Sequence, residues 1–289
     1  MGNGNGAEGE APVEASDREE RHITVISAGA LDTITRAEME TQVGTARKFR
    51  RSLAQFRSDA LAMATVDQET AASCSYMIPR DGKMIDGPSI RLAEICLACW
   101  GNLRAGARLI DEGEKFVTAQ AFCQDLQSNT TISMELRRRI TNKFGQRYSE
   151  DMVNTTANAA MAIALRNVTF RVIPQAFVEP IRQAAIVIAA GNENTLSDRR
   201  VKAVAYFTER GVPLERVLEK LAEFTERPKT GVEDLDVKDL AILHGFATSV
   251  RDGVATMSEL FAVEGEKPKS KAGALAEELK GKRGKKEEQ

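Results

Sequence analysis

Three strand-like runs follow one another between residues 102 and 142. They read NLRAGARLIDE, KFVTAQAFCQDL and TISMELRRRITN, and the short segments EGE and QSNT join them. Connections this short join antiparallel neighbours, whereas parallel strands need a crossover of about a dozen residues or more. The sequence therefore predicts an antiparallel β-meander, and the other elements have to pack around this sheet.

A β-hairpin and a short helix are predicted just before the meander. The strand CSYMIP at 74–79 leads into the turn RDGK and the return strand KMIDG, because Asp-Gly favours tight hairpin turns. A helix should follow, with Asp86 upstream, Pro88 in its first turn and Trp100 at its end.

Helical periodicity dominates the remaining segments. Residues 35–65 carry apolar side chains at spacings of three and four, which predicts one long helix. Residues 149–190 predict two helices that meet at Ile173–Pro174, and residues 195–262 predict three or four short ones. This order predicts an α+β fold, in which an antiparallel β-meander and hairpin pack against long helices and a small helical C-terminal module follows.

The composition divides the chain into four parts. Residues 1–22 are rich in Gly and Glu with few bulky apolar side chains, so we expect a disordered acidic arm. Residues 264–289 are highly charged, carry the run KGKRGKK close to their end, and should form a disordered lysine-rich tail. Between them we expect the α+β core at 23–192 and the helical module at 193–263.

The charge and hydropathy patterns restrict the function classes. The net charge is only -2, so any binding of nucleic acid must depend on a local basic surface. No run reaches the roughly 18 apolar residues of a membrane helix, and the N-terminus does not have the pattern of a signal peptide. We expect a cytoplasmic protein that does not bind a membrane, with its four cysteines as reduced thiols.

The sequence offers little support for bond-making chemistry. It has no G-x-x-x-x-G-K-[ST] loop for nucleotide phosphates, and neither of its two histidines, His22 and His244, lies near a plausible nucleophile. Its acidic residues are scattered, unlike the tight cluster of a two-metal nuclease. We therefore expect no catalytic residue, no metal ligand and no cofactor.

Cys96 and Cys99 form a Cys-x-x-Cys pair in the helix predicted before the meander. A structural zinc site would need two more ligands, and only the isolated Cys74 and Cys123 are available. Thioredoxin-like chemistry would need the pair at the start of a helix. The favoured interpretation is two small buried side chains beside the apolar stripe, although the sequence leaves metal binding open.

The densest basic run is RRRITNKFGQRY at 137–148. Alternation along a strand turns Arg137 and Arg139 outward. Lys143 and Arg147 flank the turn that Phe144 occupies, and Tyr148 follows. Cations interleaved with aromatic side chains can bind a phosphate backbone and stack bases, but a solvated strand with compensating acidic residues nearby would look the same.

Other candidate phosphate contacts lie outside this run. Arg91 is near the N-terminus of the helix after the hairpin, where free N–H groups attract phosphate. Arg80 lies on the hairpin, and Asn158 and Arg166 share the polar face of the helix that begins near residue 150. Trp100 is a weaker candidate for base stacking, because its place on the apolar stripe also suits the core.

Two long segments resemble a known family. The stretch CSYMIPRDGKMIDGPSIRLAEICLACWGNLRAGARLI, followed by a basic strand and EDMVNTTANAAMAIALRNVTFRVIP, resembles phage single-strand annealing recombination proteins related to RecT and Red-beta. The segment LSDRRVKAVAYFTERGVPLERVLEKL and its continuation are similar to a helical unit that ends such proteins. The resemblance covers roughly residues 72–182 and 195–262 and is one of overall pattern.

The resemblance implies a function. Proteins of this kind bind single-stranded DNA without ATP, anneal complementary strands through a duplex intermediate, and assemble into homo-oligomeric rings or filaments. Their DNA lies in a basic groove between a β-hairpin and a long helix. The implied protein partners are a host single-strand binding protein or a phage exonuclease, bound through the C-terminal module, and the implied location is the cytoplasm of the host cell.

Two other functions fit the sequence. One is a metal-dependent nuclease of a phage recombination system that uses scattered carboxylates. The other is a non-enzymatic structural or adaptor protein of a phage particle.

Overall fold

The computed structural model describes residues 28–80, 83–142, 144–191 and 196–261. The chain divides into two compact units, residues 1–41 and 42–289. The described part of the first unit belongs to helix α1 (Ala28–Lys48). The predicted acidic arm and lysine-rich tail lie outside the described residues.

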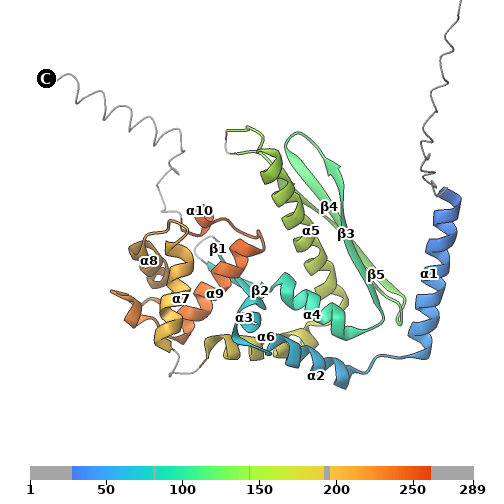
Figure 1. Cartoon of the computed structure of the whole chain (residues 1–289), viewed down its shortest axis with the longest axis horizontal. Helices are drawn as coiled ribbons and strands as arrows, with labels where there is room; N and C mark the ends of the chain where they lie inside the picture. The colour runs from blue at the N-terminus through green and yellow to red at the C-terminus, as the bar shows by residue number, and fades with distance from the viewer. Residues whose placement is uncertain (1–27, 81–82, 143, 192–195, 262–289) are drawn as a thin grey trace, which may run out of the picture. The chain divides into compact units, whose positions relative to one another are not determined.

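The second unit confirms the predicted α+β class (Figure 1). Its elements, in chain order, are α2 (Leu53–Ala64), α3 (Gln68–Ser73), β1 (Ser75–Arg80), β2 (Lys83–Pro88), α4 (Ile90–Trp100), β3 (Leu103–Glu112), β4 (Phe116–Asp125), β5 (Thr130–Arg139), α5 (Glu150–Val172), α6 (Gln175–Ala190), α7 (Leu196–Thr208), α8 (Leu214–Thr225), the 3₁₀ helix η2 (Val232–Asp234), α9 (Val237–Arg251) and α10 (Met257–Leu260). Strands β1 and β2 form an antiparallel hairpin, and β3, β4 and β5 form an antiparallel sheet in that order.

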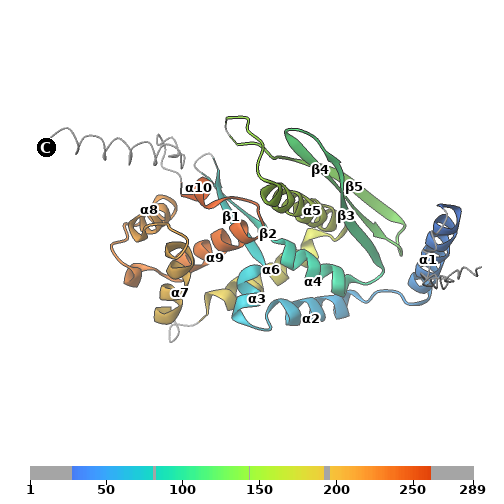
Figure 2. The ribbon, with the colours of Figure 1, turned by 45° about the horizontal axis from the view of Figure 1, so that its top comes forward.

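Helix α5 covers one face of the three-stranded sheet (Figure 2). The inward side chains of the central strand β4 include Val117, Ala119 and Ala121, all with no exposed surface. Ala160 and Ala164 of α5 pack against them in the same apolar cluster. These small side chains let the helix backbone lie close to the sheet, so the run TTANAAMAIA has a packing role.

The segment predicted as one long helix is two helices. Helix α1 ends at Lys48 and α2 begins at Leu53. Ser52 caps α2, because its hydroxyl accepts a hydrogen bond from the Gln55 backbone N–H at 3.2 Å, an arrangement that starts a new helix. Phe49 and Leu53, which belong to the apolar spacing at 35–65, are 63% and 45% exposed.

The C-terminal helices share their core with the hairpin. Phe207, Leu221, Leu243 and Phe246 are fully or nearly fully buried in one cluster, and Met77 and other hairpin side chains pack against it. Helix α9 lies directly on β1, where the Ser249 hydroxyl donates to the Met77 carbonyl at 2.5 Å. The helical region is therefore attached to the hairpin by apolar and polar contacts.

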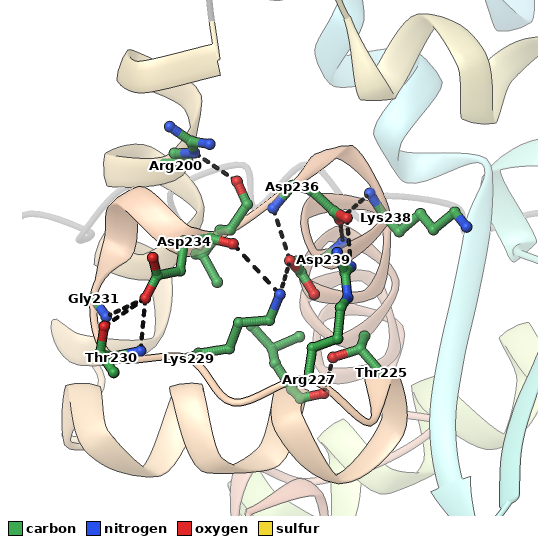
Figure 3. Close-up of polar contacts among 12 residues, drawn as sticks. Arg200, Thr225, Arg227, Lys229, Thr230, Gly231, Asp234, Asp236, Lys238 and Asp239 are labelled. Atoms are coloured by element: carbon green, nitrogen blue, oxygen red, sulfur yellow. Dashed lines mark hydrogen bonds and ion pairs between the residues drawn. The ribbon is translucent and has the colours of Figure 1, made fainter.

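A polar network holds the loop between α8 and α9 (Figure 3). The Lys229 ammonium pairs with the Asp239 carboxylate at 2.6 Å, and the two side chains are 2% and 0% exposed. Asp239 also accepts from the Asp236 backbone N–H, while the Asp236 carboxylate accepts from the first turn of α9. This reciprocal capping box fixes the start of α9.

Candidate nucleic-acid interface

The sheet face opposite α5 carries arginine and phenylalanine side chains. Strand register aligns the rows across this face, with Arg104 opposite Gln124, Arg108 opposite Gln120, and Phe116 opposite Arg139. We call this surface the outer sheet face; it comprises Arg104, Arg108, Asp111, Phe116, Thr118, Gln120, Phe122, Gln124, Ser133, Glu135, Arg137 and Arg139. Arg108, Arg137 and Arg139 are exposed, and both phenylalanines are half-buried.

Cation–π contacts organise the outer sheet face. The guanidinium carbons of Arg137 and Arg139 lie 4.7 and 5.4 Å from the centroid of the Phe116 ring. Arg104 lies 5.8 Å from the centroid of the Phe122 ring. Distances below about 6 Å are attractive, so the rings hold the arginines at the surface in positions from which guanidinium N–H groups can bind a phosphate.

Acidic residues only partly balance this charge. Glu135 lies opposite Gln120, and Asp111 lies opposite Thr118, on the same face. Arg104, Arg108, Arg137 and Arg139 outnumber them. The outer sheet face is therefore locally basic although the whole chain is slightly acidic.

The loop after β5 is electrostatically compensated. Arg147 pairs with Glu112 at 2.5 Å, lies 4.0 Å from Glu150, and donates to the Gly113 carbonyl. Phe144 is 69% exposed, whereas Tyr148 is half-buried and packs against the core between the sheet and α5. Lys143 lies outside the described residues. The charge of Arg147 is therefore compensated by nearby acidic residues, as the solvated-strand alternative expects.

A second group of predicted residues meets where the hairpin, α4 and α5 come together. Arg166 of α5 lies 4.6 Å from the centroid of the Tyr76 ring on β1. Burial lowers the pKa of Arg166, and the nearby Tyr76 and Asp252 oppose that shift. Burial likewise raises the pKa of Asp252, which Arg91, Arg251 and Arg166 oppose. Asp252 therefore brings a carboxyl group close enough to Arg91 and Arg166, two of the predicted phosphate contacts, to interact with them electrostatically.

The remaining predicted contacts are exposed on separate elements. Arg91 is exposed and pairs with Glu94 at 2.9 Å, Arg80 is exposed at the end of β1, and Asn158 is exposed on α5. Arg137 and Arg139 lie on the sheet face opposite α5, whereas Asn158 and Arg166 belong to α5 itself. The structure therefore separates Arg137 and Arg139 from the predicted residues on the hairpin, α4 and α5.

Trp100 lies in the core, which is the alternative to base stacking that its place on the apolar stripe also suited. It is 5% exposed, and its ring meets the edges of Phe56 and Phe177 with centroids 4.7 and 5.6 Å apart. Arg51 lies 4.8 Å from the Trp100 ring and pairs with Asp125. These neighbours leave little of the Trp100 ring exposed, so its main role is in packing.

The Cys-x-x-Cys pair contributes to the same core. Cys96 has no exposed surface, and burial raises the pKa of its thiol to about 12. Cys99 is half-buried, with its sulfur 3.4 Å from that of Met63. Across the residues that the structure describes, no three His, Cys, Asp or Glu side chains are grouped to hold a metal ion.

Sequence reasoning missed four of the six arginines and phenylalanines on the outer sheet face. Arg104, Arg108, Phe116 and Phe122 lie in strands that the sequence predicts, and the signal that joins them is present. Phe116 and Phe122 are an even number of residues apart, as are Arg104 and Arg108, so each pair shares a face. Pairing of the strands through their short turns then brings these residues beside Arg137 and Arg139.

Comparison with protein-family models, with curated proteins and with solved structures finds no match to this chain. The resemblance to single-strand annealing proteins therefore rests on the sequence segments that carry it. Within the described ranges, no helix is both long and apolar enough to cross a membrane.

Proposed function

We propose that this protein binds single-stranded DNA on the outer sheet face and anneals it to a complementary strand without ATP. The observation that carries the proposal is the pair Arg137 and Arg139 beside the Phe116 ring. Sheet faces that bind single strands combine cations for the phosphates with aromatic rings for the bases. Arg104 of β3 and Phe122 of β4 repeat this combination of a cation and an aromatic ring.

The chemistry of the surface suits annealing. Arginines contact the sugar–phosphate backbone without regard to sequence, and phenylalanine rings stack on any base. A base that stacks on a ring keeps its Watson–Crick edge available for a second strand. No nucleotide hydrolysis is needed, because pairing itself supplies the free energy.

The assembly and the partners follow from the resemblance and form part of the same proposal. The protein would act in the cytoplasm of a phage host as a homo-oligomeric ring or filament in which neighbouring sheet faces extend the path of one strand. A host single-strand binding protein or a phage exonuclease would bind the helical region at 196–261.

Titration of a dye-labelled oligothymidylate, followed by fluorescence polarisation, tests the DNA site. Replacing Arg137 and Arg139 by Gln should weaken binding about tenfold at low salt. It should also reduce the slope of log K against log salt by about 0.7 for each phosphate that the variant no longer neutralises. The matched control is Arg210→Gln with Lys238→Gln, which removes the same charge from the C-terminal region, at the turn after α7 and on α9. Equal affinities of the two double variants would overturn the assignment of the site.

An annealing assay separates the proposed function from its alternatives. Wild-type protein should pair two complementary oligonucleotides faster than they pair spontaneously, and Phe116→Leu should slow pairing, since one base stack contributes about 1–3 kcal/mol. Incubation with labelled DNA and Mg²⁺ or Mn²⁺ tests the nuclease alternative, which predicts degradation. An absence of both salt-sensitive binding and accelerated pairing would favour the structural or adaptor protein.

A further inference from the structure

A pocket separate from the outer sheet face lies between α3, α7 and α9. Its volume is about 420 Å³, within the roughly 300–1,000 Å³ of sites for small molecules. Gln68 lines it from α3, Lys202 and Tyr206 from α7, and His244 and Arg251 from α9. Residues far apart in the sequence thus form one concave site.

Cations dominate the polar part of this pocket. Arg199, Lys202 and Arg251 line it, and Glu69 is the only carboxylate among the lining residues that the structure describes. Arg251 is exposed at the end of α9 and Lys202 is exposed on α7, so both can change rotamer to meet a ligand. The excess of positive charge favours an anion.

Arg199 is the most buried of these cations, at 7% exposure. One terminal nitrogen, Nη2, donates to the Ala189 carbonyl at 3.0 Å. Its Nε and Nη1 atoms have no hydrogen-bond partner within the described part of the chain. A buried guanidinium with unmade hydrogen bonds is costly, and a small rotation toward the pocket would let these donors meet an oxyanion.

Because Gly191 has no side chain, the Arg199 guanidinium can occupy the space beside it. The φ angle of Gly191 is +64°, and a Cβ at this position would collide with the Arg199 guanidinium and approach the Gln68 amide. Gln68 also donates to the Ala189 carbonyl, at 3.1 Å. The end of α6 therefore holds Arg199 and Gln68 side by side at the pocket.

His244 adds an unpaired polar atom. Its Nδ1 is buried without a partner among the described residues. Burial lowers the pKa of His244 to about 4, and Arg199 and Arg251 contribute to the shift. The imidazole is therefore neutral near pH 7, and both guanidinium groups lie close enough to affect it.

The rest of the pocket lining is mainly apolar. Ala203 of α7 and Leu243 and Ala247 of α9 contribute to it, together with Tyr206. A hydrated inorganic ion would leave these side chains uncovered, whereas an organic anion would place its apolar part against them. The polar and apolar parts of the lining together define the class of ligand.

We propose that this pocket binds a small organic oxyanion, with its carboxylate or phosphate group held by Arg199, Lys202 and Arg251 and its apolar part against Leu243. A planar guanidinium binds either head group through two parallel hydrogen bonds. This site does not depend on DNA binding, and it couples α3 to the C-terminal helices, so the ligand stabilises their packing.

Ligand-observed NMR on the full chain tests the proposal with three probes of similar size: phenyl phosphate, benzoate and neutral benzyl alcohol. At least one of the two anions should bind saturably and more tightly than benzyl alcohol, and their ranking identifies the preferred head group. Arg199→Lys and Lys202→Gln should each weaken binding of the preferred anion about tenfold. Lys238→Gln, an exposed lysine of α9, should leave it unchanged.

Circular dichroism melts establish whether each variant is folded. If Arg199→Lys unfolds the chain because the hydrogen bond to Ala189 is lost, Lys202→Gln still tests the site. The proposal is overturned if neither anion shows saturable binding, or if benzyl alcohol binds as tightly as the preferred anion. It is also overturned if the Lys202→Gln and Lys238→Gln variants bind that anion with the same affinity.

Discussion

Lys229 and Asp239 form the most enclosed ion pair that the structure describes, with exposures of 2% and 0%. Taking either charge out of water is costly, and the partner's charge offsets that cost. We predict that Lys229→Met lowers the free energy of unfolding by about 3–5 kcal/mol, because it leaves the Asp239 carboxylate buried without its cation. Urea denaturation followed by circular dichroism measures the change.

Lys238→Met is the matched control, because Lys238 is exposed one residue before Asp239 (Figure 3). It should change the stability by no more than about 0.5 kcal/mol. Similar losses of stability for the two variants would show that the Lys229 pair is not sealed from water. A double replacement of Lys229 and Asp239 by Met and Leu should recover part of the stability, since well-packed apolar side chains can replace a buried pair.

At the scale of elements, the packing of α9 on β1 depends on the absence of a side chain at Gly245. A Cβ there would lie 2.5 Å from Cγ of Met77 and 3.1 Å from its backbone nitrogen. We predict that Gly245→Ala destabilises the protein by about 1–3 kcal/mol, because the strand and helix must move apart. Thermal and urea unfolding measure the effect.

The control is another glycine within a helix. A Cβ added at Gly44 of α1 would meet no atom within 4 Å. Gly44→Ala should therefore stabilise the protein by about 0.5–1 kcal/mol through helix propensity. A lower free energy of unfolding for Gly245→Ala and a higher one for Gly44→Ala would distinguish a packing constraint from helix propensity. Stabilisation by both variants would contradict the close approach of α9 to β1.

Elements were predictable from the sequence where local patterns determine them. Alternation along β5 predicted that Arg137 faces outward, and Arg137 is exposed while Ile132, Met134 and Leu136 pack against the core. The break before α2 was missed, because the apolar spacing continues from Phe49 to Leu53 across it. Helix α1 ends at Lys48, and Ser52 caps the start of α2. Burial of Trp100 depends on Phe177, a contact between distant residues that no local pattern encodes.

The division of the candidate site has the same physical cause. Strand alternation placed Arg137 on an outward face, and helical spacing placed Arg166 on the polar face of its helix. Neither pattern could show that the sheet and α5 turn these two faces away from each other. The pocket between α3, α7 and α9 likewise joins residues such as Gln68 and Arg199 that are brought together only by tertiary packing. Local periodicity thus predicted faces, while long-range contacts determined which faces form one site.

At the scale of the whole molecule, shared residues connect the apolar clusters of the second unit. Leu103 packs against both the cluster around Trp100 and the cluster between the sheet and α5. The hairpin contributes Met77 to the C-terminal cluster, while its Asp86 pairs with Arg182 of α6 at 2.6 Å. Opening one cluster therefore exposes apolar surface of its neighbour.

We predict that this coupling makes residues 42–261 unfold in one cooperative transition. The chain has one tryptophan, so fluorescence reports on the cluster around Trp100, whereas far-UV circular dichroism reports on all helices, including α7, α8 and α9. The two urea transitions should have the same midpoint and slope. If the C-terminal helices instead fold independently, circular dichroism will show an additional transition that Trp100 fluorescence does not follow, because unfolding of that region would leave the environment of Trp100 intact.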